Sequence, residues 1–439
     1  MNLNRIIDSL QKRKDLAGWT VRHVQTREAQ VYAVPRGIES QRAVDGERYL
    51  IDVLRSTATA DGSPAVGSGN ASLLPGGDIE GAIDQATLVA GLVANPVYGL
   101  PSPNPFPDVP LADETLKGDL SGVMRSVMER MQAVAAKQTD VRLTAAECFG
   151  EIRNTHLINS REIDAEEEST QVEIEYVLHG QKGDRDSETF DSMIRRRVSD
   201  LDLESAMNQR ARYTCDLLEA EAPAEWQGPV VLRGDALSIF LAGDKLNGSV
   251  LQTLASASSK FGKFSSWEIG KSVFRGEVKG DPLTVWANRA LPFGVASDRF
   301  DAEGLPAQRL ELIRDNNLSA FAANQRYAEY LQMPATGEFG NIELPAGQTF
   351  AAELLAQPHV EIVQFSWFNP DTVTGDFATE IRFGYLVENG IRKPFKGGQF
   401  IGNYMDALAN VRWSKETGFF GAYLGPHTAR FNDLKIAGE

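Results

Sequence analysis

Residues 170–180, TQVEIEYVLHG, indicate how the first half of this chain folds. The apolar residues from Val172 to Leu178 alternate with polar ones, as in an antiparallel strand that has one face on a core and the other in solvent. The preceding stretches VRLTAAECFGEI and LINSREI are expected to pair with this strand. Near the N-terminus, WTVRHV, AQVYAV and RYLIDVLRS show the same period and many β-branched residues. An antiparallel sheet is therefore predicted in the first half.

Helices are predicted where apolar residues recur at intervals of three and four positions. Four segments have this period: residues 3–10, 79–93, 116–134 and 187–219. The stretch 57–78 is rich in Gly, Ser, Ala and Pro, so we expect a loop that ends at the helix-capping residue Asp78.

The residue pattern changes at EAEAPAEWQGP, residues 219–229, where proline and acidic residues interrupt both the strand-like and the helix-like spacing of apolar residues. Short β-like runs separated by glycine turns follow, with helix-like pieces near 236–258 and 403–410. We predict an α+β protein of two domains. Residues 1–222 form an N-terminal α/β domain with antiparallel strands and long helices, and residues 223–439 form a mainly-β domain of curved or barrel-like sheets.

The composition narrows the classes of function. A net charge of −16 repels phosphate, so direct binding of nucleic acid is disfavoured. No apolar run approaches the ~20 residues that span a bilayer, and the N-terminus reads as an amphipathic helix rather than a signal peptide. Cys148 and Cys215 stand alone, which suits a reducing cytoplasm, and both are expected to be buried apolar residues.

Local signatures of catalysis are missing from the sequence. The histidines, His23, His156, His179, His359 and His427, show no metal-ligand spacing, so no metal site is predicted, and a surface position is favoured for His156. There is no G-x-S-x-G elbow. Gly270-Lys271-Ser272 resembles the end of a phosphate loop, but Ser265 stands where the required glycine would be. No cofactor is predicted, and the catalytic residues stay unknown.

Two groups of residues are weaker candidates for a site. Trp367, Arg382, Tyr385 and Asn403 could line a peptide groove, because extended peptides add to sheet edges and place alternate side chains in pockets. The competing interpretation is an ordinary β core with glycine turns. Asp301 and Glu303 could act as the carboxylates of a hydrolase, although their place beside a turn favours capping or ion pairing.

Two segments of the second half resemble a known family. Residues 288–331 contain P-x-G-x-x-S-x-x-F-D-x-E-G-x-P-x-x-R, and residues 378–411 contain a glycine-turn element. The matching positions are Pro292, Gly294, Ser297, Phe300, Asp301, Glu303, Gly304, Pro306 and Arg309, then Gly384, Tyr385, Glu388, Asn389, Gly390, Pro394, Gly397, Gly398, Gly402 and Asn403. With the closing LGPHTARFNDLKIAGE, these segments look like the TldD/PmbA family, also called modulators of DNA gyrase and related to metallopeptidases.

The resemblance also implies that the zinc ligands of one branch of the family are absent here. In the TldD branch, a helix after the strand resembling GPVVL carries His-Glu-x-x-x-His, which holds zinc together with a late cysteine. The corresponding positions here are Ala242, Gly243 and Asn247, and no cysteine follows Cys215. The chain thus resembles the metal-free PmbA (TldE) branch more closely.

The resemblance implies a cytoplasmic subunit that helps a TldD-like zinc-bearing partner to cut unfolded or leader peptides. A homodimer is the other possible assembly. Two other functions remain possible alternatives. One is a stand-alone hydrolase with an unrecognised site, and the other is a peptide-binding scaffold without enzymatic activity.

Overall fold

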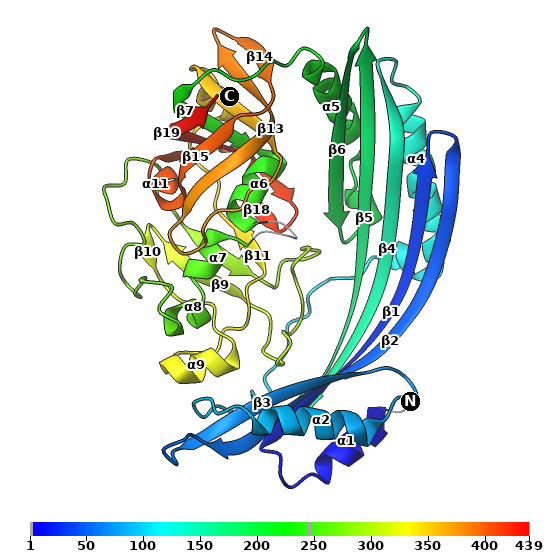
Figure 1. Cartoon of the computed structure of the whole chain (residues 1–439), viewed down its shortest axis with the longest axis vertical. Helices are drawn as coiled ribbons and strands as arrows, with labels where there is room; N and C mark the ends of the chain where they lie inside the picture. The colour runs from blue at the N-terminus through cyan, green and yellow to red at the C-terminus, as the bar shows by residue number, and fades with distance from the viewer. Residues whose placement is uncertain (1–2, 244–247, 439) are drawn as a thin grey trace.

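The computed structural model describes residues 3–243 and 248–438. A tall curved sheet with helices on one face forms the N-terminal part, and two smaller sheets form the C-terminal part beside it (Figure 1). The predicted α+β class and its two-domain organisation are confirmed. Within these described residues, no helix combines the length and apolarity needed to cross a membrane.

The N-terminal sheet has six antiparallel strands in the order β3-β2-β1-β4-β5-β6. They are β1 (Gly18–Val34), β2 (Gly37–Ala58), β3 (Pro64–Leu73), β4 (Val141–Asn159), β5 (Asp164–Lys182) and β6 (Arg185–Arg195). The stretch 170–180 lies in β5, and its alternate apolar side chains from Val172 to Leu178 are buried, as predicted.

Helices cover only one face of this sheet. They are α1 (Leu3–Gln11), α2 (Ile79–Gly91), α3 (Glu114–Gly118), α4 (Leu120–Ala135), the short 3-10 helix η1 (Val198–Asp200) and α5 (Leu203–Leu217). Met131 of α4 and Met207 of α5 share one core with Ile174 of β5. Because strand side chains alternate between faces, the residues next to this core in sequence point to the opposite side.

Two sequence-based predictions of local structure are wrong. The helix expected over 187–219 begins only at Leu203, because residues 185–195 pair with β5 as the edge strand β6. The loop expected over 57–78 contains strand β3. Gly67 and Gly69 belong to β3 and let α2 approach closely: a Cβ atom on Gly69 would lie 2.0 Å from the carbonyl oxygen of Ala86.

The C-terminal part contains a closed barrel. Strands β12-β7-β19-β15-β13 follow one another, and the pairing of β12 with β13 completes the ring. These strands are β7 (Trp226–Arg233), β12 (His359–Phe365), β13 (Asp376–Glu388), β15 (Gln399–Asn403) and β19 (Thr428–Ala437); β14 (Ile391–Phe395) and β16 (Val411–Trp413) pair at its margins. The expected barrel-like sheet is therefore present.

A second, six-stranded sheet lies below the barrel in Figure 1 and follows the order β10-β9-β8-β11-β18-β17. Its strands are β8 (Val285–Asn288), β9 (Arg309–Arg314), β10 (Asn317–Leu318), β11 (Asn341–Glu343), β17 (Thr417–Phe420) and β18 (Tyr423–Pro426). The helices here are α6 (Gly234–Ala242), α7 (Val250–Leu254), α8 (Ala257–Phe261), α9 (Gln325–Leu331), α10 (Ala351–Leu354) and α11 (Tyr404–Ala409). The single helix-like piece expected near 236–258 is thus divided, whereas the one near 403–410 is confirmed as α11.

Helix α6 belongs to the core of the C-terminal part. Leu237, Phe240 and Leu241 are fully buried, and the ring of Phe240 stacks on that of Tyr404 with centroids 4.5 Å apart. The helix ends at Gly243, whose φ of 74° is a conformation that favours glycine.

Candidate functional site

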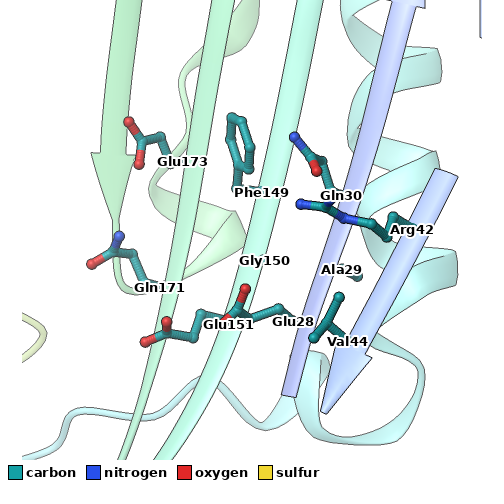
Figure 2. A pocket seen from close by; sticks show the side chains of 10 residues that line it. All are labelled: Glu28, Ala29, Gln30, Arg42, Val44, Phe149, Gly150, Glu151, Gln171 and Glu173. Carbon is teal, nitrogen blue, oxygen red and sulfur yellow. The ribbon is translucent and has the colours of Figure 1, made fainter. Parts of the chain in front are cut away.

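The open face of the N-terminal sheet carries two neighbouring rows of mostly polar side chains. We call this surface the polar face. Strand register sets out one row as Val44, Glu28, Glu151 and Gln171, and the next as Arg42, Gln30, Phe149 and Glu173, on strands β2, β1, β4 and β5 in turn. Figure 2 shows these side chains on the side of the strands away from the helix, around a hollow of about 260 Å³.

Negative charge dominates the hollow. Glu28 and Glu151 are directly opposite each other on β1 and β4, and such like-charged cross-strand pairs are unfavourable for the sheet. Arg42 is the only cationic side chain that lines the described hollow, while Arg153 lies beside it and pairs with Glu151 through Nε at 2.9 Å. A cationic group of a ligand would relieve this repulsion.

The C-terminal end of α6 is where the family resemblance would place zinc ligands. Zinc needs imidazole, thiolate or carboxylate donors, but Ala242 ends in a methyl group and Gly243 has no side chain. The third corresponding position, Asn247, lies outside the described residues. The described positions do not fit a metal centre, so no chemical step can be assigned to zinc here.

The histidines do not gather into a metal site, because among the described residues no three His, Cys, Asp or Glu side chains are placed to share an ion. His23 and His156 do face each other across β1 and β4, but each bonds outward to its own carboxylate. His23 Nε2 lies 2.8 Å from Glu47, and His156 Nε2 lies 2.6 Å from Asp164.

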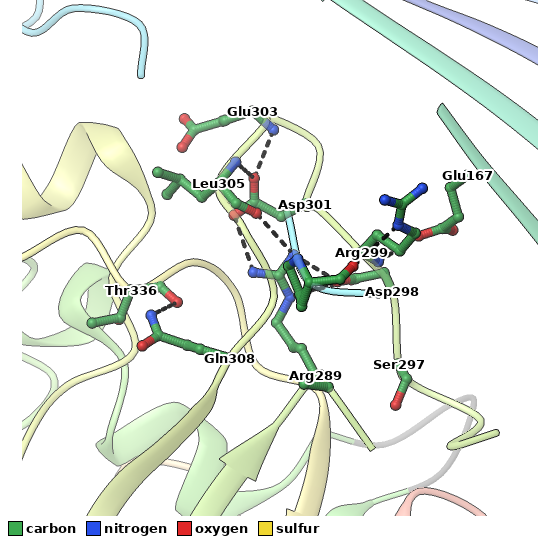
Figure 3. A network of polar contacts seen from close by, with 12 residues as sticks. Glu167, Arg289, Ser297, Asp298, Arg299, Asp301, Glu303, Leu305, Gln308 and Thr336 are labelled. Atoms are coloured by element: carbon green, nitrogen blue, oxygen red, sulfur yellow. Dashed lines mark hydrogen bonds and ion pairs between the residues drawn. The ribbon is translucent and has the colours of Figure 1, made fainter. Parts of the chain in front are cut away.

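Asp301 and Glu303 are engaged in the turn that contains them (Figure 3). Asp301 Oδ1 accepts the backbone N–H groups of Glu303 at 3.0 Å and Leu305 at 2.9 Å. Glu303 Oε2 accepts the N–H of Gln325, the first residue of α9, at 2.7 Å. These contacts match the capping role that the sequence favoured over catalysis.

A buried arginine lies at the centre of the same network. Arg289 is 1% exposed and donates to Asp298 from Nε at 2.9 Å and to the carbonyl oxygen of Leu305 at 3.3 Å (Figure 3). Desolvation, with a smaller contribution from the nearby charge of Asp301, raises the pKa of Glu303 to about 7. The family-like segment also touches the N-terminal sheet, because the backbone N–H of Arg299 donates to Glu167 Oε2 of β5 at 2.5 Å, and it is therefore a buried structural element at the contact between the domains.

The four predicted groove residues have separate roles. Tyr385 is buried and donates its hydroxyl to Asp216 Oδ2 of α5 at 2.5 Å. Asn403 caps α11, since its Oδ1 accepts the N–H of Met405 at 3.0 Å. Trp367 is about half exposed, and Arg382 is exposed and reaches the carbonyl oxygen of Glu188 at 3.5 Å. A groove built from these four stays a prediction.

Sequence reasoning missed the residues that join the two domains. Arg196, at the end of the N-terminal sheet, donates to the carbonyl oxygens of Gly294, Val295 and Ser297 at 3.1, 3.0 and 2.8 Å. The signal was visible as three consecutive arginines at 195–197 in an acidic chain. The polar face was missed too, because only strand register brings its residues into rows.

The comparisons with known proteins agree with this fold. The sequence profile of the PmbA/TldA metallopeptidase C-terminal domain matches residues 228–438. Metalloprotease PmbA of Escherichia coli O157:H7 is 26% identical over 210 residues, which is 46% of this chain and 44% of that protein. An uncharacterised protein of Methanocaldococcus jannaschii is 23% identical over 272 residues, or 58% and 60% of the two chains. The matches thus span about half the length of these relatives.

Solved structures match almost the whole chain. TldE from Thermococcus kodakarensis and a proposed modulator of DNA gyrase from Thermotoga maritima each superimpose with a TM-score of 0.82 and 16% identity, over 99% of this chain and 100% of theirs. The fold is a two-domain α+β fold that these solved structures share, and the profile of its C-terminal domain is that of a metallopeptidase-related family. The C-terminal part of the chain, residues 228–438, belongs to the TldD/PmbA family by its matching domain profile.

Proposed function

We propose that this chain is a metal-free subunit of a TldD/PmbA-type peptidase assembly, and that it helps a zinc-bearing TldD-like subunit to cleave unfolded or leader peptides. One observation carries the proposal: Ala242 and Gly243 provide no donor atom where the family resemblance places the first zinc ligands. The family membership supplies the context of peptide cleavage. We place the assembly in the cytoplasm, supported by the two free cysteines.

The polar face gives this subunit a contribution to substrate binding. Strands about 4.8 Å apart present side chains in rows that an extended peptide can follow. The carboxylates of Glu28, Glu151 and Glu173 line the hollow, so peptides with Lys or Arg are the favoured ligands. Exposed charge pairs are screened by salt, and binding should therefore weaken as ionic strength rises.

Measurements of metal content and peptidase activity test whether cleavage depends on the zinc-bearing subunit rather than on this chain. The purified chain alone should retain far less than one zinc ion per molecule after dialysis, and it should not cleave an unfolded peptide. Addition of a His-Glu-x-x-x-His subunit should produce cleavage that a chelator abolishes. Stoichiometric zinc together with chelator-sensitive cleavage by the chain alone would overturn the proposal.

Binding to the polar face can be tested separately. Glu28→Gln combined with Glu151→Gln should raise the Kd for a lysine-rich unfolded peptide about tenfold, which corresponds to ~1.4 kcal/mol. A matched control is Glu39→Gln combined with Glu388→Gln, which removes two exposed charges outside the hollow. Binding without any partner-dependent cleavage would instead favour a peptide-binding scaffold, and equal effects of both double variants would exclude the polar face.

A further inference from the structure

The loop that begins at the end of α8 combines exposed apolar side chains with cations. We call residues 260–280 the basic loop, because they contain five Lys or Arg residues and only two Glu residues, in a chain whose net charge is −16. Phe261, Phe264 and Ile269 of this loop are 43%, 60% and 55% exposed. Helix α8 lies on the side of the C-terminal part that faces away from the N-terminal sheet (Figure 1). Large apolar side chains grouped on an outer surface indicate a binding site.

Other side chains of the basic loop hold its conformation. Trp267 is buried in the core of the C-terminal part, and Ser265 Oγ donates to a backbone carbonyl oxygen of α7 at 2.6 Å. Lys260 Nζ donates to the carbonyl oxygen of Trp267 at 2.7 Å and closes a turn that contains Phe261 and Phe264. Because Trp267 supplies the apolar anchor of this turn, the two outward phenylalanine side chains remain available to a ligand.

Most cations of the basic loop are also available. Four of the five are exposed and form no ion pair with a described carboxylate. These four are Lys263, Lys271, Arg275 and Lys279. Five cations against Glu268 and Glu277 give the loop a net charge of +3. The acidic groups elsewhere on the chain act weakly here, since physiological salt screens exposed charges beyond about 8 Å.

We infer that the basic loop binds the surface of an anionic membrane. Phe261, Phe264 and Ile269 would enter the boundary between headgroups and acyl chains, where apolar side chains of peripheral proteins are buried. The lysines and Arg275 would lie beside the lipid phosphates, which attract cations close to the surface. Lysine suits this position because its stem can follow apolar surface while its ammonium group stays in water. Such binding is peripheral and reversible, and it does not depend on the proposed function.

The make-up of the basic loop favours lipid over other anionic partners. Lysine is depleted at interfaces between proteins, whereas three of the four available cations are lysines. Single-stranded nucleic acid needs aromatic faces that are free to stack on bases. The ring of Phe261 already packs against that of Tyr330, with centroids 4.9 Å apart, and Ile269 has no ring. Insertion into lipid requires only apolar surface, which Phe261, Phe264 and Ile269 all present.

Co-sedimentation of the full chain with lipid vesicles tests the inference. Phosphatidylcholine vesicles that contain about 30% phosphatidylglycerol should bind the chain at least ten times more tightly than vesicles of phosphatidylcholine alone, since the cations need anionic lipid. Raising NaCl from about 0.1 M to about 0.5 M should release most of the bound chain, because the attraction is screened. Equal binding to both kinds of vesicle would overturn the inference. So would binding to oligothymidine or polyglutamate without binding to the anionic vesicles.

Charge variants test whether the basic loop makes this contact. Lys263→Gln combined with Lys271→Gln should weaken binding to the anionic vesicles about 25-fold, because each lysine near such a surface contributes roughly fivefold. Lys393→Gln combined with Lys435→Gln is the matched control, since it removes two exposed lysines outside the loop and should leave binding unchanged. Equal losses in the two double variants would show that only the total charge matters and would overturn the assignment to this loop.

An apolar variant tests insertion. Phe264→Ser should weaken binding about tenfold at either salt concentration, because the lost contribution is the burial of an apolar ring and not an attraction between charges. Ile391→Ser is the control, since Ile391 of β14 is 62% exposed and lies outside the basic loop. Both variants should keep the circular dichroism spectrum of the wild type. Unchanged binding by Phe264→Ser would overturn insertion of the loop into lipid.

Discussion

The guanidinium of Arg196 donates from Nη2 to the carbonyl oxygen of Ser297 at 2.8 Å and joins the last strand of the N-terminal sheet to the C-terminal domain. Two further carbonyl oxygens of the same loop, those of Gly294 and Val295, accept from Arg196. In the reverse direction, Arg299 donates from Nε to the carbonyl oxygen of Pro107 at 3.1 Å. Each domain thus places an arginine among backbone oxygens of the other.

Replacement of Arg196 should loosen the contact between the domains. Arg196→Ala removes donors to four carbonyl oxygens, three of them in the other domain, and should lower the free energy of unfolding by about 2 to 3 kcal/mol, since hydrogen bonds from charged donors contribute roughly that much. Urea unfolding would measure the loss, and limited proteolysis should cut residues 291–300 faster. Arg212→Ala, at an exposed position on α5, is the control and should change neither. Equal stability of the two variants would contradict the structural role.

The stability of the protein should decrease as the pH rises from about 5 to 8. Burial raises the pKa of Glu303 to about 7 from an ordinary value of 4.5. The folded chain keeps a proton that the unfolded chain releases, so this stabilisation is complete below the unfolded pKa and is lost as the pH passes through 7. Glu303→Gln should remove a pH-dependent contribution on the order of 1 to 2 kcal/mol, measured by urea unfolding at each pH. An unchanged slope would show that Glu303 is already ionised.

A methyl group at Gly69 should separate α2 from the sheet. The Cβ atom of Gly69→Ala would overlap the carbonyl oxygen of Ala86, and such overpacking costs about 2 kcal/mol or more. Thermal unfolding would report the loss. Gly276→Ala is the control, because a Cβ atom there meets nothing within 4 Å. Similar melting temperatures for both variants would mean that α2 moves at little cost.

Cys148 should resist alkylation in the folded protein. Its thiol is fully buried, with Sγ 3.5 Å from Met131 Sδ, and desolvation raises its pKa to about 12. Cys215 is only partly buried, which departs from the burial expected for both, and should react first. Mass spectrometry after iodoacetamide treatment would compare the two. Rapid native labelling of Cys148 would contradict this environment.

Local patterns explain which elements the sequence predicts well. The alternation in residues 170–180 gives β5 because each apolar side chain there faces one core. Strand β6 was not predicted from the sequence, because RDSETFDSMIR forms an edge strand and contains little apolar alternation. Its identity depends on pairing with β5, which is a tertiary effect.

The candidate site was harder to predict than the fold. The missing donors at Ala242 and Gly243 can be read directly from the sequence, but the polar face cannot. Glu28 and Glu151 are 123 positions apart and become neighbours only through the register of β1 and β4. Tyr385 was predicted to line a peptide groove, whereas its side chain is buried and bonds to Asp216 on α5, a contact between domains that no local pattern indicates.

The ring of the C-terminal barrel has a consequence for biosynthesis. Strand β19, residues 428–437, lies between β7 and β15, so β7 must wait for nearly two hundred further residues before it gains this neighbour. The N-terminal sheet is complete at residue 195 and can form while translation continues. On the ribosome, β7 and α6 would therefore be exposed for many seconds, and chaperones would find their binding sites in this interval.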